Sequence, residues 1–168
     1  MVALQHAIHM NAPELFSDEV TAVPTESEYA LNIVGVYQDT VTQSWGVPMC
    51  RLATQLAGED HIRNTWFDVD SLNDIETLLE AVRAALVADV IVISVYAAEE
   101  LPLGLYVWID AWLPRRTSRE GALTALIGAD EPQDLRSFCT RDYLHAVARK
   151  AQLDFIPLFE NRIQGMRA

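Results

Sequence analysis

The sequence predicts an α/β domain in which five parallel strands form one sheet with helices on both faces. From Ala30 onward, short apolar runs rich in Val and Ile alternate with longer segments whose apolar residues recur at helical spacing. One run, Val90–Val95, is apolar without alternation, as a central parallel strand covered on both faces requires. For five strands joined by right-handed crossovers we expect the doubly wound strand order 2-1-3-4-5.

The first expected elements are a strand at 31–37, a helix at about 41–57, a strand at 64–69 and a helix at about 73–87. Both strands are short apolar runs bounded by polar residues. Each helix has an apolar stripe; Gly58 ends the first, and Asp70 or Ser71 caps the second. The first stripe has spacings of four, three and four and consists of Trp45, Met49, Leu52 and Leu56.

The remaining elements are a strand at 90–95, a helix at 103–113, a strand at 122–127, a helix at about 140–152 and a strand at 154–158. Pro102 opens the first of these helices, and Thr140 is the expected cap of the second. This organisation divides the chain into an N-terminal arm at 1–28, a doubly wound domain at 29–160 and a C-terminal tail at 161–168.

Composition excludes several classes of function. Twelve Lys and Arg face 24 Asp and Glu among 168 residues, a net charge of -12 that argues against nucleic-acid binding. No stretch has the length of a membrane span, and the N-terminus lacks the pattern of a signal peptide, so we expect a cytoplasmic protein without membrane partners. Cys50 and Cys139 are too few for a disulfide framework, and no residue spacing indicates a metal site.

The strand order places any small-molecule site at the carboxyl ends of the first, third and fourth strands. The loops expected there are residues 38–43, 96–101 and 129–133. They carry five carboxylates, which disfavour an anionic ligand: Asp39, Glu99, Glu100, Asp130 and Glu131. No nucleophile with an adjacent base is found, so we assign no catalytic residues.

Residues 88–110 carry a resemblance. Ala88-Asp89 precedes the central strand, a loop with Tyr96 and Pro102 follows it, and the next helix contains Ile109-Asp110. This segment resembles the flavodoxin and NADPH-dependent FMN reductase superfamily. The resemblance implies a flavodoxin-like fold and an FMN site in which Tyr96, Ala97 and Glu99 lie beside the flavin ring.

The loop after the first strand departs from that family's pattern. Those flavoproteins hold the FMN phosphate in a loop of Ser, Thr and Gly, because backbone N–H groups must approach it closely. Here Thr40, Thr42 and Ser44 supply hydroxyls, but the first glycine is Gly46 and Asp39 adds a negative charge. A phosphorylatable receiver domain, which shares the element order, would need an acidic pair and a Lys that this sequence does not place suitably. A degenerate receiver remains an alternative.

The helix at 103–113 is apolar around most of its circumference. Such a helix must bury more than one face, either under the N-terminal arm or against another subunit. We expect self-association as a homodimer, with Tyr106, Trp108 and Trp112 at the interface. The alternative is that both tryptophans belong to the monomer core.

Two functions of different class follow from these observations. The first is a flavodoxin-like binding or regulatory domain that self-associates, has no cofactor and has lost the phosphate-holding loop. The second is an FMN-dependent NAD(P)H oxidoreductase of the flavin or quinone reductase type. In it Thr40, Thr42 and Ser44 hold the phosphate, and the flavin performs the hydride chemistry.

Overall fold

The computed structural model describes residues 30–117 and 119–161. The described residues from Leu31 onward belong to one compact unit, and the fold is described from there. The predicted arm at 1–28 lies outside the described residues. So does the predicted tail, apart from Asn161, which belongs to the last strand.

The five predicted strands form one parallel sheet in the order β2-β1-β3-β4-β5, which confirms the predicted fold class. The central strand β3 has five fully buried residues in a row, in agreement with its continuous apolar sequence. The strands are β1 Leu31–Tyr37, β2 Ile62–Asp68, β3 Val90–Tyr96, β4 Ala122–Ala129 and β5 Asp154–Asn161.

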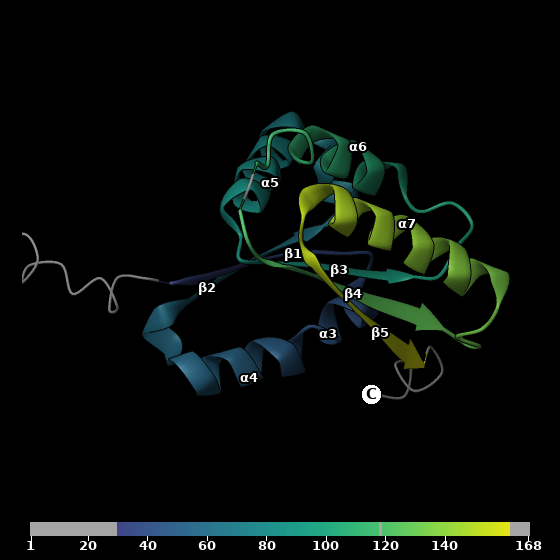
Figure 1. Ribbon diagram of the computed structural model, residues 1–168, viewed down its shortest axis with the longest axis horizontal. Helices are drawn as coiled ribbons and strands as arrows, with labels where there is room; N and C mark the ends of the chain where they lie inside the picture. Colours follow the sequence, from purple (N-terminus) through teal and green to yellow (C-terminus); the bar gives the residue numbers. More distant parts are fainter. Residues whose placement is uncertain (1–29, 118, 162–168) are drawn as a thin grey trace, which may run out of the picture. The chain divides into compact units, whose positions relative to one another are not determined.

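Helices cover the two faces of the sheet unequally. Figure 1 shows α5, α6 and α7 on one side and α3 and α4 on the other. The α5–α7 side holds the larger hydrophobic cluster, and the opposite side a smaller one around Ile33, Trp45, Val92 and Leu126. The helices are α3 Thr40–Ser44, α4 Val47–Ala57, α5 Ile75–Val87, α6 Leu103–Trp112 and α7 Leu135–Ala151, with short 3-10 turns at Glu59–His61 and Val69–Asn73.

The single helix predicted at 41–57 is two helices. It breaks at Trp45 and Gly46, and Pro48 lies in the first turn of α4. Proline has no N–H to donate to a preceding turn, so it suits the start of a helix and not its interior. The predicted end is confirmed, since Gly58 follows α4 with a φ of 89°.

Two predicted helix caps were wrong. Asp74, not Asp70 or Ser71, caps α5 by accepting a hydrogen bond from the Thr77 N–H at 3.1 Å. The helix α7 begins at Leu135 because Asp134 accepts the Ser137 N–H at 2.8 Å. Both carboxylates take the position at which an N-cap side chain satisfies an otherwise unpaired backbone donor.

Thr140, the predicted cap of the last helix, is buried inside α7. Its hydroxyl accepts the Ala98 N–H and donates to the Ala98 carbonyl, both at 3.0 Å. The residue therefore attaches α7 to the loop that follows β3.

Candidate functional site

The loop after β1 closes on itself through a capping box of Asp39 and Thr42. The Thr42 hydroxyl accepts the N–H groups of Gln38 and Asp39 at 2.8 and 2.9 Å and donates to the Asp39 carbonyl at 3.0 Å. The Asp39 carboxylate accepts the Thr42 N–H at 2.9 Å. Three backbone donors and one hydroxyl of the predicted phosphate loop are thus satisfied by the loop itself.

Tyr96, at the end of β3, binds this loop from the side. Its hydroxyl donates to the second oxygen of Asp39 at 2.8 Å, and its N–H donates to the Gln38 side-chain carbonyl at 3.1 Å. Its ring packs edge-on against Trp45, with 5.6 Å between centroids. The sequence named Tyr96 and the β1 loop separately, and the fold brings them into contact.

The Asp39 carboxyl is stabilised in its charged form. Partial burial alone would raise its pKa, but hydrogen bonds from the Thr42 N–H and the Tyr96 hydroxyl outweigh that effect and lower the pKa below its ordinary value. At neutral pH the Asp39 carboxylate is therefore negatively charged in the same loop that the FMN hypothesis assigns to the flavin phosphate.

The other residues named for the flavin site lie along the same edge. Thr40 and Glu99 are exposed, and the Ser44 hydroxyl donates to the Val41 carbonyl. The Ala97 N–H donates to the Gly128 carbonyl of β4 at 2.8 Å. Of the named groups, the side chains of Thr40 and Glu99 make no hydrogen bond within the described part of the chain. Assignment of these residues to a flavin site stays a prediction.

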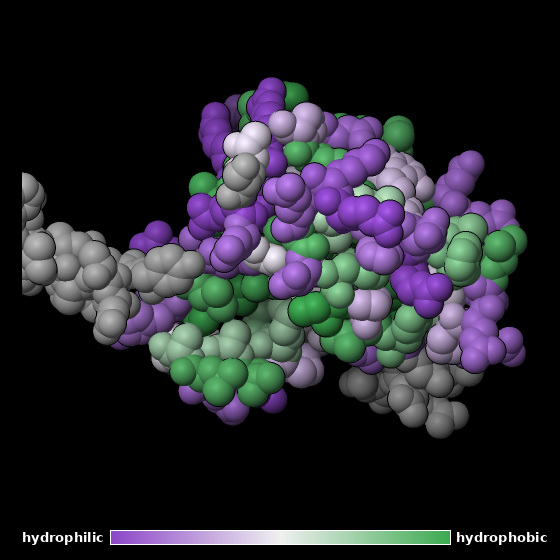
Figure 2. All heavy atoms as spheres, in the orientation of Figure 1, coloured by the Kyte–Doolittle hydropathy of each residue, from purple (hydrophilic) through white to green (hydrophobic). Residues whose placement is uncertain are grey.

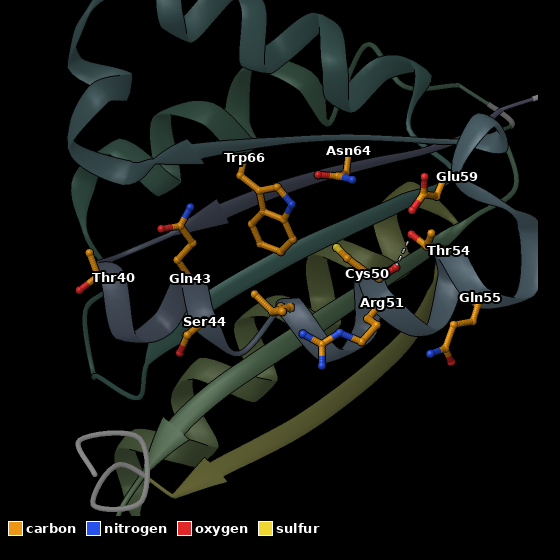
Figure 3. Close-up of a pocket in the computed structure, with 12 residues that line it drawn as sticks. Thr40, Gln43, Ser44, Cys50, Arg51, Thr54, Gln55, Glu59, Asn64 and Trp66 are labelled. Carbon is orange, nitrogen blue, oxygen red and sulfur yellow. Dashed lines mark hydrogen bonds between the residues drawn. The ribbon is translucent and has the colours of Figure 1, made fainter. Parts of the chain in front are cut away.

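A hollow of about 740 Å³ lies between α3, α4 and β2, and two of the residues named for the flavin phosphate, Thr40 and Ser44, line one end of it. Figure 3 shows Trp66 reaching from β2 toward α4, where Cys50 and Arg51 lie. The hollow extends along α4, none of whose residues is fully buried. Its lining is Thr40, Gln43, Ser44, Gly46, Val47, Cys50, Arg51, Thr54, Gln55, Glu59, Asn64 and Trp66.

The indole of Trp66 packs directly against the backbone of two glycines, which leave room for it. A Cβ on Gly35 of β1 would lie 2.2 Å from the ring, and one on Gly46 would lie 2.3 Å from it. Burial raises the pKa of the neighbouring Cys50 thiol, and a hydrogen bond with Trp66 opposes that rise. Sequence reasoning named Thr40 and Ser44 but missed the part of the hollow formed with Trp66, although a glycine inside a strand, such as Gly35, is a known signal of close approach.

The tryptophans predicted at an interface lie in the core of the domain. Trp108 and Trp112 have no exposed surface and pack against each other at 5.8 Å between ring centroids. Tyr106 is half-buried: its hydroxyl accepts the Leu101 N–H at 2.9 Å, and its ring packs against Tyr143. The assignment of both tryptophans to an exposed interface is therefore corrected in favour of the alternative, the monomer core. Self-association itself stays a prediction.

Among residues 30–117 and 119–161, no group of three or more His, Cys, Asp or Glu residues lies close enough together to hold a metal ion. No helix in the same ranges is long and apolar enough to cross a membrane.

Comparisons with known proteins show the fold. No protein-family model matches the chain, and no curated protein matches its sequence. An apo NADH:FMN oxidoreductase structure is similar with a TM-score of 0.55 and 18% identity, over 78% of this chain and 75% of that one. A short-chain flavodoxin associated with a non-canonical PDU bacterial microcompartment is similar with a TM-score of 0.54 and 16% identity, over 82% and 90% of the two chains. The chain has a flavodoxin-like fold.

Proposed function

We propose that this protein is a flavodoxin-like binding domain that self-associates and does not hold FMN in the loop after β1. The observation that carries the proposal is the Asp39–Thr42 capping box. A flavin phosphate in this loop would need free N–H groups, and those of Gln38, Asp39 and Thr42 are already bound within it.

Charge supports the same conclusion. The three loops at the carboxyl edge, residues 38–43, 96–101 and 129–133, contain five acids and no Lys or Arg. The lowered pKa of Asp39 keeps its carboxylate charged at neutral pH, next to the position that the phosphate would take. A phosphate that accepted the Thr42 N–H would have to displace the Asp39 carboxylate that now accepts it.

A titration of the purified protein with FMN tests the proposal, with flavin fluorescence and calorimetry as readouts. We expect no saturable binding up to the millimolar range at low salt. Micromolar binding that Thr40→Ala weakens by about tenfold, the loss of one charge-assisted hydrogen bond of ~1.5 kcal/mol, would overturn it. Leu103→Ala, an exposed residue of α6 on the far side of the sheet, is the matched control.

The second candidate is an FMN-dependent NAD(P)H oxidoreductase. It is favoured by the similarity to an NADH:FMN oxidoreductase and a flavodoxin, and by the place of Tyr96 beside the β1 loop. The residues present do not fit an FMN phosphate while Asp39 caps α3, so we derive no reaction step through the cofactor. The same titration separates the two candidates.

A further inference from the structure

One side of the sheet carries an apolar surface on its edge strand. Ile156 and Leu158 of β5 remain 45% and 47% exposed. They pair in register with Thr124 and Leu126 of β4, and Leu126 belongs to the cluster around Trp45 on the α3–α4 side. Because neighbours in register point to the same face, Ile156 and Leu158 lie on that side too. Parallel sheets are usually covered on both faces, and Ile156 and Leu158 therefore lie where a covering helix is expected.

The helix α4 on the same side is apolar toward solvent. Leu52 and Leu56, two members of the apolar stripe with Trp45 and Met49, are 56% and 80% exposed. Figure 2 shows hydrophobic residues gathered on the surface of the molecule at α4. An exposed apolar surface that is surrounded by polar residues is typical of an interaction site.

The charges of the two surfaces are complementary. The helix α4 contains Arg51 and no acidic residue, in a chain with 24 acids. By the alternation of a strand, Asp154 and Glu160 share the face of β5 that carries Ile156 and Leu158. We call these four residues the β5 strip. An apolar helix with a cation matches an apolar strip flanked by two anions.

We infer that two copies of this chain associate with α4 of each copy lying on the β5 strip of the other. This inference rests on the proposed self-association and names the surfaces that make it. A two-fold axis satisfies both contacts at once, because α4 of the first copy then lies on the β5 strip of the second, and α4 of the second copy lies on the β5 strip of the first. Each copy supplies the helix that the other copy's sheet edge lacks, and Arg51 faces the acids at the ends of the strip.

Light scattering and sedimentation of two single variants test the surfaces. Leu56→Glu and Leu158→Glu each place a carboxylate in the proposed contact, and we expect each to raise the dimer dissociation constant by about tenfold or more. Leu103→Glu is the matched control, since Leu103 is 76% exposed on α6 at the other face of the sheet, and it is expected to leave the dimer unchanged. Circular dichroism checks that each variant is folded.

A charge exchange provides the second measurement. Arg51→Glu alone and the pair Asp154→Arg with Glu160→Arg are each expected to weaken the dimer, and all three changes together to restore it. A wild-type protein that is monomeric at every concentration would overturn the proposed self-association. A dimer that survives Leu56→Glu and Leu158→Glu, or that Leu103→Glu dissociates, would overturn only the surfaces inferred here.

Discussion

At the scale of single residues, Asp39 is the side chain that argues against a phosphate in the β1 loop. Its carboxylate caps α3 and accepts the Tyr96 hydroxyl, so one side chain joins the first turn of a helix to the end of the central strand. A free N-terminal turn offers its donors to an anionic ligand, whereas here the Thr42 N–H is already bound by the Asp39 carboxylate.

The charge of Asp39 makes a pH-dependent contribution to stability. Because its pKa is lower in the folded state than the ordinary 3.8, the contribution is present above about pH 4 and is lost as pH falls through the folded pKa. We expect Asp39→Asn to lower the free energy of unfolding at pH 7 and to have a smaller effect in strong acid. Urea denaturation over a pH series measures this.

A second variant that also removes one carboxylate provides the control for that series. Asp142→Asn removes an exposed carboxylate on α7 and is expected to have little effect. If Asp39→Asn lowered stability equally at every pH, its effect would arise from shape and not from charge.

At the scale of elements, α6 is the helix that the core surrounds. Four of its residues are buried, and Leu105, Trp108, Ile109 and Trp112 belong to the same cluster as residues of α5, α7 and the sheet. The arginine that follows α6, Arg116, donates to the Ala85 carbonyl of α5 at 2.7 Å and closes that end of the layer. The apolar residues around α6 are thus buried mainly within one chain.

Replacing a core tryptophan is expected to destabilise the fold. Trp108→Ala leaves a cavity in the larger cluster and should lower the free energy of unfolding by about 3–5 kcal/mol. Leu103→Ala removes a residue that is 76% exposed and should change it little. Chemical denaturation checks both. If Trp108→Ala left the stability unchanged but abolished association, Trp108 would contact a second copy and would not belong to the monomer core.

At the scale of the whole molecule, net charge opposes self-association. Each copy carries -12, so two copies repel one another over a distance set by the Debye length, from ~30 Å at 0.01 M salt to ~8 Å at 0.15 M. One cation on α4 offsets this only locally. An apolar contact between α4 and β5 must hold against the repulsion.

The dimer fraction is therefore expected to increase with salt. Sedimentation at a fixed protein concentration, from low to physiological sodium chloride, measures it. Addition of salt screens the repulsion and leaves the apolar contact in place. Association that weakens steadily as salt rises would indicate instead that charge pairs hold the two copies together.

The sequence by itself determined the fold, because its signals are local. Apolar runs, helical spacing and Gly58 each act within a few residues, and they specify five strands and most of the intervening helices. The strand order followed from the right-handed crossovers that such a sheet requires. The acidic β1 loop without glycine was also visible in the sequence. The break at Trp45 and Gly46 was not, because the apolar spacing runs through it.

The tertiary structure alone decided which residues meet. The contact of Tyr96 with Asp39 spans 57 positions, and Thr140 bonds to Ala98 instead of capping its helix. Periodicity shows that a helix side is apolar but not what covers it. Hence Trp108 and Trp112 are buried in the core, whereas Leu56, from an equally apolar stripe, faces solvent, because helix packing depends on the arrangement of the whole sheet.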